Sequence, residues 1–257
     1  MGFLFRPKEL PRPASLTFTL DQAGHTYDDG HVGLAPTDIT ISELRVAVIG
    51  LNGAGKSTLL GLLDGSLKAN AGTVTIAGGE ERLDPAVKKD AKRIDNLVGK
   101  VRREEIPNSF YQAANISEAL KKHKVPESER HARIGNLFAH FDLAQVSKAK
   151  ASELDSEKRH LLAIAAALSF EPSAIVADEP SKGLDEIGAA HVAKALFSYN
   201  KQVIFATHDT DMIRRPEYAI DRVLVLDEHA VAFDGAPAEA VAFYEDLIRR
   251  KYEAAKR

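Results

Sequence analysis

Two kinds of apolar pattern run along the chain, and they predict two kinds of β-structure. From Ser15 onward, Leu16, Phe18 and Leu20 alternate with polar residues, and residues 38–41 alternate in the same way. A period of two is typical of a strand with one buried face. Almost continuously apolar segments indicate parallel strands that are covered on both faces. Three such segments occur, at residues 45–49, 174–177 and 203–206.

The helical period dominates the middle of the chain, at about residues 106–170. Ile116 and Leu120 lie on one face of a predicted helix, and residues 134–141 repeat this amphipathic spacing. Residues 161–168 form a more fully apolar helix. We therefore expect a helical subdomain inserted into an α/β domain.

The two ends of the chain have different patterns. Residues 6–13 contain three prolines, which predicts a disordered leader over residues 1–14. At the other end, Pro237 suits the first position of a helix on which Val241 and Tyr244 share a face. We expect a single domain over residues 15–257.

Composition excludes several classes of protein. The net charge of −3 argues against coating of nucleic acid by bulk electrostatics, so no nucleic-acid partner is expected. The chain has no cysteine, which rules out disulfides and cysteine-based metal sites and fits the cytoplasm. The longest apolar stretch, residues 161–170, is half a membrane span, so a membrane role would need a partner protein.

A phosphate-binding loop follows the apolar segment 45–49. Residues 50–58 match G-x-x-x-x-G-K-[ST] at every fixed position, and the helical segment 56–63 comes next. Backbone N–H groups and the helix N-terminus would hold the phosphates of ATP, with Lys56 on the β- and γ-phosphates and Ser57 on Mg²⁺. The predicted nucleotide-binding residues of the loop are Gly50, Asn52, Gly53, Ala54, Gly55, Lys56, Ser57 and Thr58.

Two carboxylates and a histidine follow the later buried strands. Asp178 comes at the end of strand 174–177 and can hold Mg²⁺, and the adjacent Glu179 can polarise an attacking water as general base. His208 ends strand 203–206 at the same sheet edge, where it can hydrogen-bond a γ-phosphate oxygen. The alternative interpretation of Asp178 and Glu179 is that each is a solvated loop carboxylate, and the alternative for His208 is a structural histidine.

In this order the motifs resemble the ATP-binding subunits of ABC transporters, over residues 16–243. The resemblance implies that Tyr27 stacks on adenine, although a strand aromatic packed in the β layer is the alternative. It also identifies residues 181–185 as the D-loop and residues 221–226 as part of the usual C-terminal run. Overall the chain is most similar to importer subunits of the cobalt, biotin and energy-coupling-factor type.

Two departures from the family pattern stand out. The signature, Leu-Ser-Gly-Gly-Gln in the family, falls on residues 154–158, where only the leucine is kept. In the family this motif contacts the γ-phosphate held by a second subunit. Asp155 and Glu157 would bring negative charge there, and Lys158 would compensate in part. The Q-loop glutamine is also missing near residues 100–104, where Arg103 replaces it unless the motif lies elsewhere.

The sequence thus predicts an α/β fold with a P-loop (RecA-like) core, a mainly parallel sheet, an N-terminal antiparallel β layer and an inserted helical subdomain. The resemblance implies an ATPase with ATP and Mg²⁺ as cofactors, which powers an ABC-type transporter through ATP-dependent dimerisation. Its partners would be an integral-membrane subunit and a second ATPase subunit, with a heterodimer favoured and a homodimer possible. The protein would be cytoplasmic and peripheral on the inner face of the cell membrane. The alternatives are a low-turnover dimerisation switch, a non-transport ABC ATPase and, more distantly, a metabolic P-loop kinase.

Overall fold

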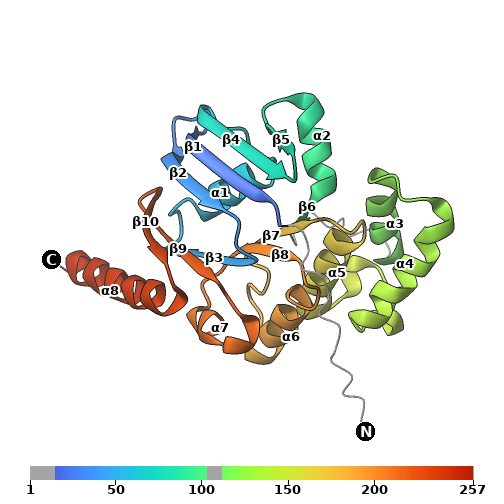
Figure 1. The fold of residues 1–257 in the computed structure, drawn as a ribbon. Helices are drawn as coiled ribbons and strands as arrows, with labels where there is room; N and C mark the ends of the chain where they lie inside the picture. The colour runs from blue at the N-terminus through green and yellow to red at the C-terminus, as the bar shows by residue number, and fades with distance from the viewer. Residues whose placement is uncertain (1–14, 103–111, 257) are drawn as a thin grey trace, which may run out of the picture.

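The computed structural model describes residues 15–102 and 112–256 and contains two β-sheets with helices between and around them (Figure 1). The predicted leader, residues 1–14, and the Q-loop candidate Arg103 lie outside the described residues.

The smaller sheet is the predicted antiparallel layer. Its four strands lie in the order β2-β1-β4-β5, and every pair is antiparallel. Phe18 and Leu20 of β1 are buried while the polar residues between them are more exposed, as the alternation predicted. The strands are β1 (Thr17–Thr26), β2 (Val32–Ile41), β4 (Ala71–Gly78) and β5 (Glu81–Leu83).

The larger sheet has six strands in the order β10-β9-β3-β8-β7-β6. All its pairs are parallel except β10 with β9, which form an antiparallel hairpin at one edge. The three continuously apolar segments are its central strands, as predicted. The strands are β3 (Arg45–Gly50), β6 (Val98–Val101), β7 (Ala174–Asp178), β8 (Gln202–Ala206), β9 (Arg222–Asp227) and β10 (Ala230–Gly235).

The two faces of the larger sheet belong to two separate cores. Val46 and Val48 of β3 pack with the antiparallel layer and with the helix that follows the phosphate loop, whereas Ala47 and Ile49 pack on the opposite face. Because neighbouring side chains on a strand point to opposite faces, β3 is apolar at consecutive positions. This explains why its sequence does not alternate.

Helices cover both faces, and three of them lie in the segment predicted to be helical. Helix α1 occupies the space between the two sheets, and α3 and α4 lie at the far side from the antiparallel layer (Figure 1). The helices are α1 (Lys56–Leu63), α2 (Lys88–Leu97), α3 (Gln112–Lys122), α4 (Glu127–His140), α5 (Ser156–Leu168), α6 (Glu186–Leu196), α7 (Thr210–Arg214) and α8 (Pro237–Ala255).

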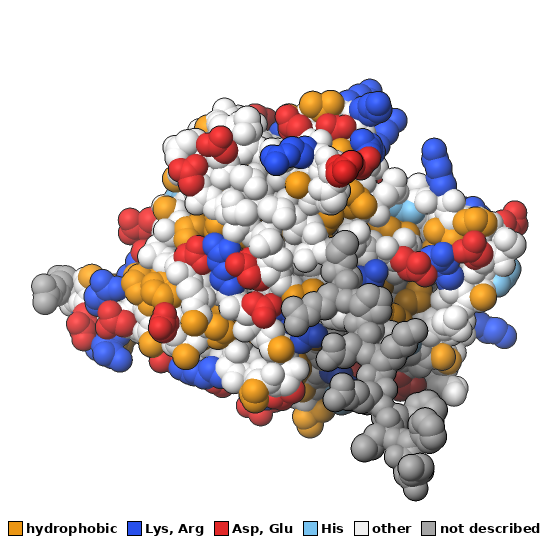
Figure 2. All heavy atoms as spheres, in the orientation of Figure 1, with side chains coloured by type: hydrophobic (Ala, Val, Ile, Leu, Met, Phe, Trp, Pro, Cys, Tyr) orange, Lys and Arg blue, Asp and Glu red, His pale blue; other side chains and the backbone are white. Residues whose placement is uncertain are grey.

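The surface carries charges of both signs. Figure 2 shows lysine and arginine side chains interspersed with aspartate and glutamate on the face that it presents, and apolar side chains lie between them. This mixture agrees with the small net charge of −3. Within the described part of the chain, no helix is both long enough and apolar enough to span a bilayer.

Candidate functional site

The phosphate loop connects β3 to α1, and its backbone is shaped by glycines. Gly55 occupies the cap position of α1 with φ 102°, and Gly53 has φ 79°, both in the left-handed region that glycine tolerates. A Cβ on Gly55 would lie 2.6 Å from the carbonyl oxygen of Gly33. No side chain of the described residues caps α1, so the first N–H groups of this helix remain available to an anion.

Lys56 is buried at the base of this loop. Its Nζ donates to the carbonyl oxygens of Gly50 at 2.8 Å and Leu51 at 3.2 Å. Burial lowers the pKa of Lys56, and the nearby carboxylates of Glu179 and Asp178 oppose this shift. The ammonium group is thus held between backbone carbonyls and two carboxylates, within reach of the loop that would bind phosphate.

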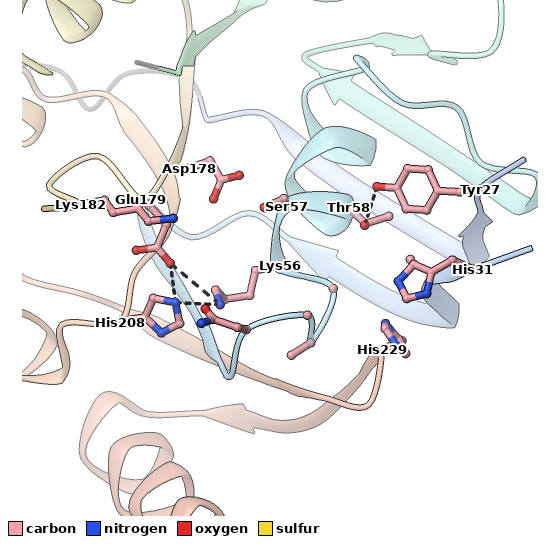
Figure 3. A pocket seen from close by; sticks show the side chains of 15 residues that line it. Tyr27, His31, Lys56, Ser57, Thr58, Asp178, Glu179, Lys182, His208 and His229 are labelled. Carbon is pink, nitrogen blue, oxygen red and sulfur yellow. Dashed lines mark hydrogen bonds and ion pairs between the residues drawn. The ribbon is translucent and has the colours of Figure 1, made fainter. Parts of the chain in front are cut away.

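The predicted site residues meet in one pocket of about 250 Å³, which the close view shows (Figure 3). The loop forms its floor, and Asp178, Glu179 and His208 close one end. Tyr27, His31 and His229 stand at the other end. Gly50 alone among the predicted residues does not line the pocket; its carbonyl instead accepts from Lys56.

Glu179, His208 and Lys56 form a close cluster. His208 Nε2 lies 3.0 Å from Glu179 Oε1 and 3.3 Å from Lys56 Nζ. The role of Nε2 depends on the imidazole tautomer: it accepts from Lys56 Nζ when it is unprotonated, and it faces the Glu179 carboxylate as an N–H when it is protonated. Glu179 Oε1 is buried and receives no well-aligned hydrogen bond from the described residues. A buried carboxylate oxygen in this condition is a strong acceptor for a water or a ligand group.

The backbone at Glu179 is unusual as well. Its φ is +46°, in the left-handed region that is rare for a residue with a Cβ. The N–H of Glu179 donates to the carbonyl of Ala206 in the neighbouring strand β8, 3.2 Å away, which holds this conformation. Strain of this kind concentrates at functional sites, and here it directs the carboxylate toward His208.

Burial also lowers the pKa of His208, while the Coulomb attraction of Glu179 acts in the opposite direction. Burial thus favours the neutral form of the imidazole. A neutral imidazole has one N–H donor and one acceptor nitrogen, so it can donate to a phosphate oxygen while it accepts from Lys56.

Ser57 and Asp178 lie on the wall between the main pocket and an adjoining pocket of about 210 Å³, since both line the two spaces. A hydroxyl and a carboxylate are the oxygen ligands that Mg²⁺ takes beside nucleotide phosphates. Among the described residues no group of three or more His, Cys, Asp or Glu side chains could hold a metal alone. The donor set thus fits Mg²⁺ bound jointly by two side chains, phosphate oxygens and water.

Tyr27 lies on the pocket wall. The residue is 38% exposed, and its hydroxyl lies 3.0 Å from Thr58 Oγ1. A strand aromatic packed inside the β layer would be buried, as Phe18 of β1 is, whereas Tyr27 directly follows the last residue of β1. The structure therefore favours a ring surface that is available to a planar ligand over the alternative of core packing.

The altered signature carries the partial compensation of charge that the sequence predicted. Asp155 caps α5, accepting from the Lys158 N–H at 2.8 Å, and its other oxygen pairs with Lys158 Nζ at 2.7 Å. Glu157 turns toward His191 on α6, 3.0 Å away, and a histidine offsets negative charge only when it is protonated. Lys158 therefore offsets the charge of Asp155, whereas the charge of Glu157 has a neighbour that can be neutral.

Sequence reasoning missed two residues at the far end of the pocket, His31 and His229. His31 lies beside the turn between β1 and β2, and His229 is in the turn between β9 and β10. Neither belongs to a motif, and only the pairing of distant strands brings them together. The proximity of His31 to Tyr27 along the chain was the one available signal.

Comparison with known proteins agrees with this arrangement. A strand, a glycine-rich phosphate loop and a helix, with carboxylates at the neighbouring strand end, define a P-loop nucleotide-binding protein. The family model for ABC transporters matches residues 37–182. A Deinococcus radiodurans protein that bears the name of an ABC transporter ATP-binding protein is 33% identical over 231 residues, covering 89% of this chain and 97% of that protein. The chain therefore belongs to the ABC transporter family, and it is an ATP-binding, ATP-hydrolysing subunit.

Two further similarities are to ATP-binding subunits of membrane transporters. The biotin transport ATP-binding protein of Rhizobium etli is 27% identical over 232 residues, covering 90% of this chain and 99% of that protein. The solved structure of cbiO1 from Clostridium perfringens, part of the transporter complex cbiONQ, has a TM-score of 0.74 and 27% identity, with 92% and 94% of the two chains covered. The predicted similarity to transporter ATPases of the biotin and energy-coupling-factor type is thus confirmed.

Proposed function

We propose that the chain binds ATP with its triphosphate on the loop 50–58 and hydrolyses it to drive a transporter in the membrane. The observation that carries the proposal is the cluster of Lys56, Glu179 and His208 at one end of the phosphate pocket. In this pose the γ-phosphate lies at that end, and the adenine lies at the other end against Tyr27. Glu179 accepts a proton from the attacking water, and His208 donates to a γ-phosphate oxygen.

Lys56 changes partners when the nucleotide binds in this scheme. Its Nζ now donates to two loop carbonyls and is 3.9 Å from Glu179 Oε1. Phosphate oxygens are stronger acceptors than neutral carbonyls, so the ammonium group moves toward the β- and γ-phosphates. Once Lys56 is paired with phosphate, the Glu179 carboxylate is the acceptor that remains for water.

Mg²⁺ is proposed as the second cofactor, held by Ser57 and Asp178. When bound it would neutralise charge on the β- and γ-phosphates. Ser57 is the second residue of α1, so its hydroxyl lies beside the N–H groups that bind phosphate. Asp178 is the last residue of β7, next to Glu179. The two ligands therefore come from the same elements that position the phosphates and the proposed base.

The membrane partner would hold the chain at the inner face of the cell membrane. The Rhizobium etli and Clostridium perfringens proteins serve a transporter, and we extend this role to the present chain. A tagged chain purified from gently solubilised membranes of its own cells should bring an integral-membrane protein with it, at defined stoichiometry. The same tag on a chain recovered only from the soluble fraction, without such a protein, would contradict the transport role and favour a non-transport ABC ATPase.

A second ATPase subunit with an intact signature is the favoured dimer partner. Lys158 offsets the charge of Asp155, but Glu157 lies against His191, which is charged only when protonated, so negative charge remains at the motif. Ser156 and Glu157 also stand where the family motif has glycines, and their side chains occupy room that a glycine leaves to a phosphate. A homodimer in which Ser156 and Lys158 serve as a variant signature is the alternative.

The ATPase activity of the purified chain alone distinguishes the two dimers. If a heterodimer is needed, turnover should be low and a symmetric ATP-bound dimer should be absent in light scattering. Adding the partner ATPase should then raise turnover at the site formed by this chain's Lys56. Ordinary turnover with cooperative dependence on ATP, together with a symmetric dimer, would refute the heterodimer. Low turnover that no partner raises would favour the dimerisation switch.

A further inference from the structure

The turn between β9 and β10 has an unusual composition for its shape. Asp227 pairs with Ala230, which leaves Glu228 and His229 as a two-residue hairpin loop. Their φ angles are +45° and +66°. Two-residue loops with positive φ at both positions strongly prefer Asn-Gly or similar pairs, since these residues tolerate the left-handed region. The chain instead places two residues with larger side chains there.

The position of this turn explains why Glu228 and His229 occupy it instead of a pair such as Asn-Gly. The carbonyl of His229 accepts from the N–H of Ala35 in β2 at 2.7 Å, and the Cα of His229 lies 3.5 Å from where a Cβ on Gly55 would be. The turn is thus fixed between the antiparallel layer and the phosphate loop. On the other side, Lys251 of α8 pairs with Asp227 at 2.5 Å and with Glu228 at 3.3 Å.

The environment of the His229 ring is unfavourable for the free energy of folding. Its Nδ1 is buried and has no hydrogen-bond partner among the described residues. A buried imidazole nitrogen in this condition does not stabilise the fold, and together with the left-handed backbone it marks a position that is kept for another purpose. The ring also lines the nucleotide pocket (Figure 3).

His229 continues a row of rings that begins at Tyr27. The rings of Tyr27 and His31 are 20° from parallel with centroids 6.2 Å apart, and His31 meets His229 edge to face at 5.1 Å. All three line the pocket at the end opposite Glu179 and His208. If the phosphates occupy the loop, this end receives the sugar and the base.

We propose that His229 is a further nucleotide-binding residue that contacts the nucleoside part of the bound nucleotide, with His31 extending the Tyr27 ring surface toward it. This inference rests on the nucleotide pose of the proposed function. The left-handed backbone of the turn presents an imidazole at the nucleoside end of the pocket, and the ion pair between Lys251 and Asp227 joins the turn to α8 independently of Glu228. Since the contact lies away from the γ-phosphate, it should affect ATP and ADP equally.

Two glycine variants in the same turn test the proposal. Glycine accepts positive φ at either position, so His229→Gly and Glu228→Gly should both fold. In titrations that displace a fluorescent ATP analogue, His229→Gly should raise the Kd for both ATP and ADP about fivefold, equivalent to about 1 kcal/mol. The kcat at saturating ATP should stay within about twofold of wild type. Glu228→Gly, which alters the same backbone but does not line the pocket, should leave both Kd values unchanged.

Three results would overturn the inference. They are unchanged Kd values in His229→Gly, an equal loss of affinity in Glu228→Gly, and a loss for ATP alone, which would place the ring near the γ-phosphate. Tyr27→Ala separates failure of this inference from failure of the underlying pose. If the pose is right and only the His229 contact is absent, Tyr27→Ala still weakens ATP binding. If the pose is wrong, both variants leave the affinity unchanged.

Discussion

Replacing Glu179 with glutamine should reduce the kcat of ATP hydrolysis by about 10²- to 10⁴-fold, the usual contribution of a general base. The amide is similar in size to the carboxylate but cannot accept a proton from the attacking water. ATP binding should persist, because the phosphate loop and Tyr27 are untouched. The measurements are phosphate release at saturating ATP and a nucleotide titration on the same preparation.

The geometry at Glu179 makes this result specific. Oε1 is buried 3.0 Å from the His208 ring and 3.9 Å from Lys56 Nζ, and it receives no well-aligned hydrogen bond from the described residues, so the substitution breaks no hydrogen bond of the fold at that oxygen. Glu81→Gln is a suitable control, since Glu81 lies on β5 and pairs with Arg93 at the surface. A Glu179→Gln enzyme that hydrolyses ATP within about threefold of wild type would exclude Glu179 as the base.

Local sequence patterns predicted the framework of this site well. The apolar run 45–49, the glycine-rich loop and the helix 56–63 each correspond to one observed element, β3, the loop and α1. Short-range chemistry determines these elements, because a buried strand, a turn with positive φ and a helix N-terminus each have their own residue preferences. The order of the motifs then identified the family.

Contacts between distant segments were not predictable in the same way. Glu157 pairs with His191, 34 residues away, and only the packing of α5 against α6 determines that pair. The turn at Glu228 and His229 has no sequence signal of a tight hairpin, since its residues are the opposite of what the backbone prefers. Motif type and spacing therefore predicted the residues that line the phosphate end of the pocket, whereas residues brought in by tertiary packing, such as His229, carried no such signal.

Replacing Lys56 with alanine should weaken ATP binding itself, in contrast to Glu179→Gln. A hydrogen bond to a charged group contributes about 1.5–3 kcal/mol, so the Kd for ATP should rise roughly 10- to 150-fold. Lys68→Ala is the matched control, because Lys68 is exposed and its Nζ contacts only the carbonyl of Ala86 among the described residues. A Lys56→Ala protein that binds ATP as tightly as Lys68→Ala would contradict the proposed phosphate contact.

The contribution of Lys56 to folding has to be separated from its contribution to binding. Its Nζ satisfies the Gly50 and Leu51 carbonyls, and its stem is buried, so alanine also removes packing and leaves these acceptors without a donor. Lys56→Met keeps most of the stem and removes only the ammonium group. If the ammonium group acts chiefly on phosphate, Lys56→Met should retain more of the wild-type Tm than Lys56→Ala and yet lose ATP affinity by a similar factor. The opposite result would be a Lys56→Met protein that loses as much Tm as Lys56→Ala but binds ATP like the wild type. That result would assign the loss of ATP affinity in Lys56→Ala to a change in the fold of the loop.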